Sequence, residues 1–109
     1  MAKAIGQRGS WFADVEGQSL PCVHAYWMSK DRYNEPNAQP DSSPWPEFIT
    51  AIKREKKVIL RQSERRDAPV NGRGDFTSVG YVAVFSVEEV EVKDGHLTFR
   101  FVKRLMDLD

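Results

Sequence analysis

Hydrophobic and polar residues alternate most regularly in the C-terminal part of the chain, where they predict a long β-strand. Val79, Tyr81, Ala83, Phe85 and Val87 occupy every second position, which is the period of one face of a strand. Between Tyr81 and Phe85 the residues on the other face are apolar as well. This strand is therefore predicted to be central and covered on both faces.

The alternation changes phase after this strand, because the next apolar positions are Val90 and Val92. A β-bulge near Glu88-Glu89 would account for the change. The Asp94-Gly95 dipeptide that follows is a favoured two-residue hairpin turn. Pairing outward from this turn predicts four pairs: Val92 with Leu97, Glu91 with Thr98, Val90 with Phe99, and Glu89 with Arg100.

A helix is predicted in the middle of the chain. Its apolar residues follow the spacing i, i+3, i+4 and i+7, which makes one stripe facing a sheet: Trp45, Phe48, Ile49 and Ile52. Ser42 or Ser43 is placed to cap the helix. Pro44 and Pro46 fall where early helical N–H groups lack partners in any case.

Two further segments are predicted to be strands. Residues 57–62 include a short β-branched run, which predicts a buried strand after the helix. Near the N-terminus, residues 11–15 and 20–28 flank the turn signal Glu16-Gly17 and predict a first hairpin. With the C-terminal hairpin this gives about five strands and one principal helix.

These elements predict an α+β fold in a single domain spanning residues 1–109. The expected architecture is a small, strongly curved antiparallel or mixed β-sheet, or a partly open β-barrel of about five strands, with the helix packed on it. Residues 1–8 are expected to be frayed. Residues 29–43 and 63–76 lack apolar periodicity and are rich in turn residues, so they are predicted to be long surface loops.

The middle of the chain also resembles a known family. Residues 54–61 (REKKVILR) lie at the helix-to-strand junction, and Gly74-Asp75 and residues 79–82 (VGYV) follow. In this order they resemble RNA-associated PUA-type barrels of the ASCH kind. Arg54 stands where that family has glycine and Ile59 where it has an acid, and the residues ahead of the helix have no counterpart. The resemblance implies a barrel-like fold, and no functional residue is carried over from it.

Charge is balanced over the whole chain but is unevenly distributed along it. Residues 53–73 hold eight basic and three acidic side chains, a net charge of +5, whereas residues 1–52 carry −2 and residues 74–109 carry −3. A cationic stretch in an otherwise acidic protein indicates a surface for an anion, above all a phosphate backbone. Part of the stretch has a simpler explanation, since basic side chains at a helix C-terminus complement the helix dipole.

The adjacent residues Tyr26 and Trp27 add an aromatic component to this hypothesis. Side chains alternate along a strand, so one of the two points away from the core. An exposed aromatic ring near arginine is the arrangement that single-stranded nucleic acid uses for stacking and backbone contact. Burial of each ring is the alternative. The residues predicted to bind nucleic acid are Lys53, Arg54, Lys56, Lys57, Arg61, Arg65, Arg66, Arg73, Tyr26 and Trp27.

Catalytic and metal-binding chemistry has little support in the sequence. Cys22 and His24 are two positions apart and would share one face of a strand, which allows a thiol and imidazole pair. A small buried cysteine beside a hydrogen-bonded histidine is the expected arrangement. The spacing of Cys22, His24 and His96 matches no zinc pattern. We therefore predict no catalytic residue, no metal ligand and no cofactor.

Cysteine usage and hydropathy bear on the compartment. The single cysteine cannot form an internal disulfide, which agrees with a reducing environment. The chain has no apolar run of the length that a secretory signal or a membrane span needs. The sequence therefore predicts a cytoplasmic protein without a membrane partner.

Three classes of function follow from these observations. The leading hypothesis is a small non-enzymatic module that binds RNA or single-stranded DNA through residues 53–73. The second is a protein-interaction or regulatory domain, such as a small phage or bacterial regulator or a homodimer, that uses the Pro-rich loop and exposed aromatic residues. The third is a small enzyme that uses Cys22 and His24.

Overall fold

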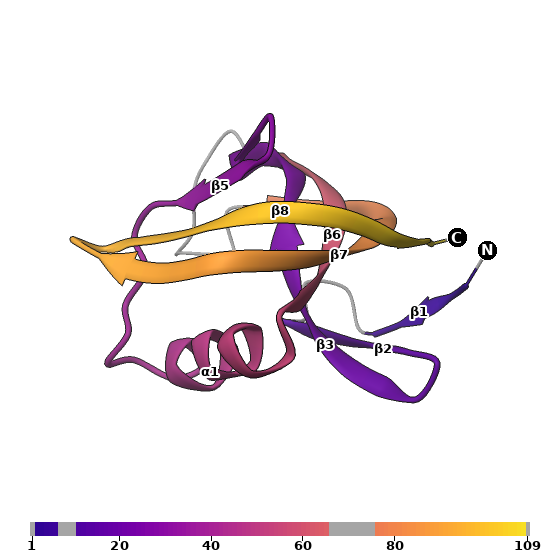
Figure 1. The fold of residues 1–109 in the computed structure, drawn as a ribbon, viewed down its shortest axis with the longest axis horizontal. Coiled ribbons are helices and arrows are strands. Elements are labelled where there is room, and N and C mark those ends of the chain that lie inside the picture. The colour runs from indigo at the N-terminus through magenta and orange to yellow at the C-terminus, as the bar shows by residue number, and fades with distance from the viewer. Residues whose placement is uncertain (1, 7–10, 66–75, 109) are drawn as a thin grey trace.

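Eight strands and one α-helix form in the part of the chain that the computed structural model describes, residues 2–6, 11–65 and 76–108 (Figure 1). In chain order they are β1 (Ala4–Ile5), β2 (Phe12–Val15), β3 (Gln18–His24), the 3₁₀ turn η1 (Ala25–Trp27), β4 (Met28–Ser29), β5 (Arg32–Glu35), α1 (Trp45–Glu55), β6 (Lys57–Arg65), β7 (Phe76–Lys93) and β8 (His96–Asp107). No helix among these residues is long and apolar enough to cross a membrane.

The strands form one mixed sheet in the order β1-β2-β3-β6-β7-β8-β5-β4. Only β3 and β6 are parallel neighbours, and the other pairs are antiparallel. The predicted α+β class with one helix is confirmed, as is a mixed sheet. The prediction of five strands was too low, and the sheet is mostly open rather than closed into a barrel, with β1 and β4 at its edges.

Two predicted irregular regions contain strands that the hydrophobic pattern did not indicate. Ala4–Ile5 pairs with β2, so the expectation of a frayed N-terminus is wrong for these residues. In the predicted loop 29–43, Arg32–Glu35 pairs with β8, and Tyr33 and Glu35 are both buried. A buried glutamate breaks the apolar alternation from which strands are recognised. In the other predicted loop, β6 extends to Arg65 and β7 begins at Phe76; the residues between lie outside the described part.

The C-terminal hairpin forms with the predicted turn and bulge. Asp94 and Gly95 have φ values of 52° and 76°, as a two-residue hairpin turn requires. The predicted pairs of Val92 with Leu97 and Glu91 with Thr98 are confirmed. The register then shifts, and Glu88 pairs with Arg100, so the two outer predicted pairs are wrong. Glu89 takes a φ of 58° within this bulge and leaves the ladder.

Helix α1 buries the predicted apolar stripe against the sheet. Trp45, Phe48, Ile49 and Ile52 are all buried. Capping by Ser42 or Ser43 is wrong, because Pro44 occupies the N-cap position and no side chain caps the helix. The helix ends where Lys56 adopts a left-handed conformation with φ 54° and its N–H bonds to the Ile52 carbonyl.

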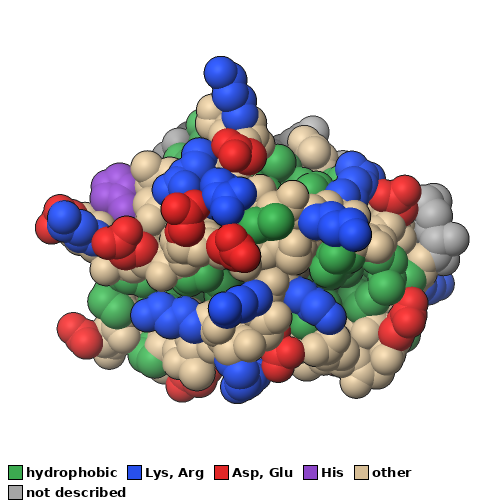
Figure 2. All heavy atoms as spheres, in the orientation of Figure 1, with side chains coloured by type: hydrophobic (Ala, Val, Ile, Leu, Met, Phe, Trp, Pro, Cys, Tyr) green, Lys and Arg blue, Asp and Glu red, His purple; other side chains and the backbone are tan. Residues whose placement is uncertain are grey.

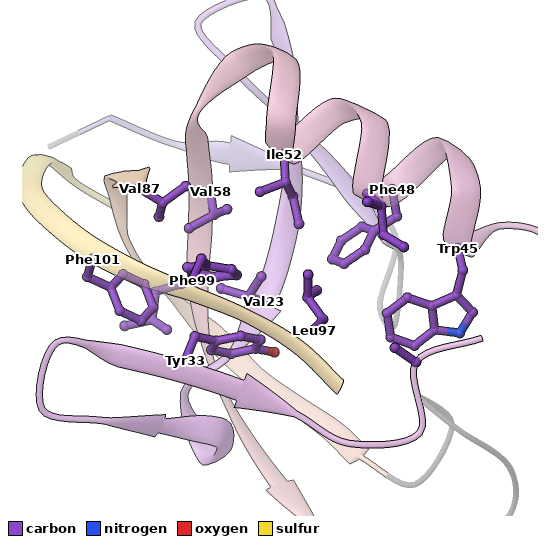
Figure 3. Close-up of a cluster of buried hydrophobic side chains, with 13 residues drawn as sticks. Val23, Tyr33, Trp45, Phe48, Ile52, Val58, Val87, Leu97, Phe99 and Phe101 are labelled. Atoms are coloured by element: carbon purple, nitrogen blue, oxygen red, sulfur yellow. The ribbon is translucent and has the colours of Figure 1, made fainter. Parts of the chain in front are cut away.

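The sheet has a separate apolar cluster on each face. One lies between α1 and the sheet, where helix residues meet rings from β5 and β8 (Figure 3). The other lies on the opposite face and is formed by small and aliphatic residues, most of them from β1, β2, β3, β6 and β7. Strand β6 contributes to both, because Val58 and Leu60 belong to the first cluster and Ile59 to the second.

The hydroxyl of Tyr33 joins two strands that are not neighbours in the sheet. It accepts a hydrogen bond from the backbone N–H of His24 at 3.2 Å and donates one to Oε1 of Glu35 at 2.7 Å. His24 ends β3, whereas Tyr33 lies on β5, and three strands separate these two in the sheet. The sheet must therefore curve until its two sides approach each other.

We predict that Tyr33→Phe lowers the free energy of unfolding by about 1–3 kcal/mol, because it removes a hydrogen-bond partner from two buried polar groups. The ring and its stacking on Phe99, at a centroid distance of 4.6 Å, are retained, so the change isolates the hydroxyl. Urea unfolding measures the effect. Tyr26→Phe is the matched control, because Tyr26 is exposed. Equal stabilities of the two variants would contradict the prediction.

Candidate nucleic-acid interface

The basic stretch of the sequence is divided by strand β6. Lys57 begins this strand and Arg65 ends it. Eight residue steps in a strand span about 26 Å, at about 3.3 Å per residue. Lys53, Arg54 and Lys56 therefore lie near one end of β6, and Arg65 lies at the other. The basic positions of this stretch that the structure describes are therefore spread along β6 instead of gathered at one of its ends.

The first group of basic residues lies at the end of α1. Lys53, Arg54 and Lys56 are exposed, and Lys57 is half-buried. Arg54 is paired with Glu55 through Nε and Oε1 at 3.1 Å. Basic side chains gather over α1 and the start of β6, whereas acidic and basic side chains are mixed over β7 and β8 (Figure 2). This group is a part of the predicted interface that faces solvent.

Arg61 does not belong to any solvent-facing patch. It is only 1% exposed, so its predicted direct contact with nucleic acid is incompatible with this conformation. Arg61 is in register with His24 on β3 and with Tyr81 on β7. Arg61 lies in a central strand, with β3 on one side and β7 on the other.

On the sheet face opposite α1, Arg61 lies in a row of polar side chains that crosses neighbouring strands. His24 and Cys22 share this face of β3, as predicted from their spacing, and both are buried. Burial and the nearby Cys22 raise the pKa of Tyr81, whereas Arg61 acts in the opposite direction. The row was missed as a unit because its members come from three strands. Among the described residues, no group of three or more His, Cys, Asp or Glu could hold a metal ion.

The predicted aromatic residues lie beside the later half of β6. Tyr26 and Trp27 belong to η1, which follows His24 directly and lies against β6. Their rings meet edge to face, with centroids 4.7 Å apart and an interplanar angle of 86°. Tyr26 is 50% exposed, and Trp27 is partly buried. The predicted site residues Arg66 and Arg73 lie outside the described part of the chain.

A surface hollow near the end of α1 was not predicted from the sequence. Its volume is about 380 Å³, and it is lined by Lys53, Lys56, Glu88, Glu89 and Val90. The two lysines and the three β7 residues are more than thirty positions apart in the chain. The bulge in β7 was the available signal, but nothing in the sequence indicates that it faces the helix end.

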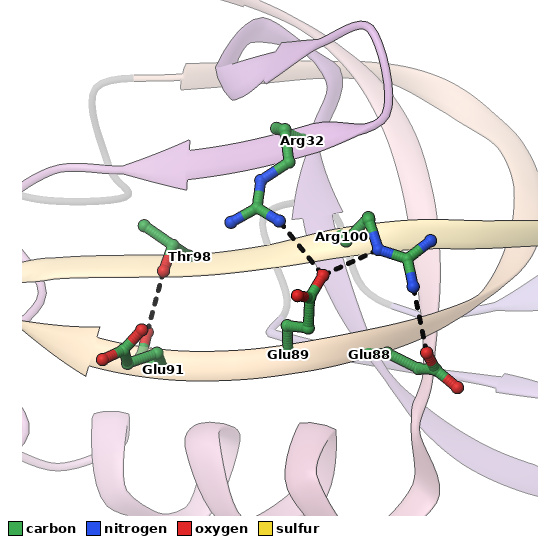
Figure 4. Close-up of polar contacts among 6 residues, drawn as sticks. All are labelled: Arg32, Glu88, Glu89, Glu91, Thr98 and Arg100. Atoms are coloured by element: carbon green, nitrogen blue, oxygen red, sulfur yellow. Dashed lines mark hydrogen bonds and ion pairs between the residues drawn. The ribbon is translucent and has the colours of Figure 1, made fainter.

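The acidic wall of this hollow belongs to an ion-pair network that connects β7, β8 and β5 (Figure 4). Oε2 of Glu89 accepts hydrogen bonds from Nε of Arg100 at 2.7 Å and from Nη1 of Arg32 at 3.2 Å. Nη2 of Arg100 also donates to Oε2 of Glu88 at 3.1 Å. The hydrogen bond from Arg100 is the main cause that lowers the pKa of Glu89.

We predict that Arg100→Gln raises the pKa of Glu89 toward its usual value, and does so by more than Arg32→Gln. NMR titration of the Glu89 side-chain carboxyl carbon measures both. Because the folded-state pKa is lowered, the stabilisation from ionised Glu89 is present above the unfolded-state pKa of about 4.3 and is lost as the pH falls through the folded-state pKa. The stability difference between wild type and Glu89→Gln should therefore disappear in acid. Equal pKa shifts in the two arginine variants would contradict the assignment.

Comparisons with known proteins assign neither a family nor a function. No family model matches the chain, and no curated protein or solved structure matches it either. The resemblance to PUA-type barrels of the ASCH kind therefore has no support from a match of these kinds. The functional interpretation depends on the residues and geometry described above.

Proposed function

We propose that this chain is a small module that binds RNA or single-stranded DNA. The observation that carries the proposal is the exposed basic group at the end of α1. Within residues 53–57, four basic side chains and one acidic side chain give a net charge of +3. Exposed lysines and arginines of this density supply the electrostatic, sequence-independent part of nucleic-acid affinity.

The exposed ring of Tyr26 supplies a second kind of contact. Trp27 supports this ring edge to face, so the ring offers a face to a ligand from a defined position. Base stacking on an aromatic side chain tolerates any base, since every base has a π-face. Stacking needs an unpaired base, which favours a single strand over a duplex.

The two contacts are complementary in chemistry and separate in space. Basic side chains near the start of β6 attract phosphates, and the aromatic turn beside its later half receives a base. The turn directly follows His24, which is in register with Arg61. From Lys57 to Arg61 the strand advances four residues, about 13 Å at about 3.3 Å per residue, which corresponds to roughly four nucleotides at the duplex spacing of about 3.4 Å per nucleotide. A ligand that reaches both must therefore be several nucleotides long.

Charge reversal at the helix end should weaken binding in a salt-dependent way. For the variant Lys53→Glu with Arg54→Glu, we expect a less steep decrease of log K with log salt. The magnitude of the slope should be smaller by about 1.4 for single strands, because two phosphate contacts are lost. Fluorescence anisotropy with single-stranded RNA, single-stranded DNA and duplex DNA at two salt concentrations measures this.

The matched control is Lys93→Glu with Lys103→Glu, which changes the net charge equally at exposed lysines on β7 and β8. The control should retain most of the slope. An equal loss in both variants would mean that only net charge matters. Absence of binding by the wild type at low salt would overturn the proposal.

Removal of the exposed ring should weaken binding without changing its salt dependence. We expect Tyr26→Ala to cost about 1–3 kcal/mol of binding free energy, the range for a base stacked on an aromatic side chain. The same anisotropy titration at fixed salt measures it. Tyr26→Phe keeps the ring and should bind as the wild type does. An alanine variant of unchanged affinity would remove the aromatic turn from the interface.

A further inference from the structure

We infer that the hollow between the end of α1 and the bulge of β7 binds a single phosphate group. This inference rests on the proposed function and deepens it, because it names the group that the helix end holds and the residues that hold it. The ligating side chains are Lys53 and Lys56. The binding chemistry is common to a nucleic-acid backbone, a free phosphate and a phospholipid headgroup.

One wall of the hollow is fixed by backbone hydrogen bonds. The N–H of Lys56 bonds to the carbonyl of Ile52 at 2.9 Å, which closes the helix. The carbonyl of Lys56 accepts the N–H of Val87 at 2.9 Å, which fastens the helix end to β7 directly before the bulge. Lys53 lies in the last turn of α1, Lys56 directly follows the helix, and both line the hollow. Both ammonium groups are thereby carried by a fixed backbone.

The second of these hydrogen bonds also reduces an unfavourable effect. Unsatisfied carbonyl groups give a helix C-terminus a partial negative charge, which repels an anion. The carbonyl of Lys56, which follows the last helical residue, accepts the N–H of Val87. The negative end of the helix is therefore partly compensated on the side that faces β7.

The acidic wall of the hollow is neutralised by arginines. Glu89 extends from β7 toward β8 and β5, away from α1 (Figure 4). Its carboxylate bonds to Arg100 and Arg32, and Glu88 bonds to Arg100. Two negative and two positive charges therefore cancel on this side.

The two lysines remain as the net charge of the hollow, which is +2 with its paired arginines included. A phosphate ester group carries a charge of about −1.5 to −2 near neutral pH when it is terminal, and it presents strong acceptor oxygens. The volume of about 380 Å³ exceeds that of a single water, about 30 Å³, by enough to admit such a group. Charge and size therefore favour phosphate.

Titration of the full-length protein with inorganic phosphate tests the site directly. In ¹H–¹⁵N spectra we expect saturable shifts of the backbone amides of Lys56, Val87 and Glu88, and no such shifts with chloride at equal ionic strength. The variant Lys53→Gln with Lys56→Gln should lose about tenfold in phosphate affinity, as expected for two exposed charge contacts. Glutamine has a similar length and leaves the fold intact, which circular dichroism verifies.

Two further variants make the result specific. Lys93→Gln with Lys103→Gln removes the same charge elsewhere and should leave phosphate affinity nearly unchanged. Glu88→Gln removes a negative charge from the rim and should raise the affinity. Shifts that appear equally with chloride, or that survive loss of both Lys53 and Lys56, would overturn the inference.

Two competitors identify the source of the phosphate. An abasic oligodeoxyribonucleotide that displaces phosphate identifies a nucleic-acid backbone as the ligand, whereas phosphatidic acid vesicles that displace it identify a lipid headgroup. If phosphate binds and neither competitor displaces it, the phosphate site is supported but the proposed nucleic-acid function is overturned. Nucleic-acid binding that is unchanged in the Lys53→Gln, Lys56→Gln variant, with no phosphate shifts, overturns the site and leaves the proposed function intact.

Discussion

The shape of the sheet depends on the hydrogen bond between the Tyr33 hydroxyl and the end of β3. It connects the end of β3 to β5 although three strands lie between them in the sheet. A flat sheet would hold these strands far apart, so the hydrogen bond requires strong curvature. The same hydroxyl donates a hydrogen bond to the buried carboxylate of Glu35, which reduces the cost of burying that carboxylate. One side chain therefore both holds the sheet in its curved shape and provides a hydrogen bond to a buried carboxylate.

The position of the candidate interface follows from this constraint. His24, whose N–H binds the Tyr33 hydroxyl, is followed directly by η1 with Tyr26 and Trp27. Fixing the end of β3 therefore fixes the place where the aromatic turn begins. The parallel pairing of β3 with β6 then sets this turn beside the later part of β6. The basic helix end is attached to the opposite end of the same strand, so β6 acts as the spacer between the two contacts.

Elements with a clean apolar period were predictable from the sequence, and elements with buried polar residues were not. The helix stripe and the hairpin turn at Asp94-Gly95 were recognised because their periodicity and turn chemistry are local. Strand β5 was missed because Glu35 is buried through a partner on its own strand. Arg61 was assigned to the surface because it belongs to a basic stretch of the sequence. Local charge, however, does not show which face of a central strand a residue occupies. Charge along the sequence is therefore a weaker guide to a surface than exposure in the fold.

The bulge in β7 shows how a local irregularity organises a site. Its phase change was visible in the sequence, yet the register beyond it was not, because Glu89 leaves the ladder and still reaches Arg100 through its side chain. Had the regular register continued, Glu89 would lie directly opposite Arg100, and Glu88 would point to the other face of the sheet. The bulge instead allows one guanidinium to bind both carboxylates. Because these acids pair with arginines within the sheet, they do not neutralise the lysines at the helix end. Those lysines therefore remain as uncompensated positive charge beside the bulge.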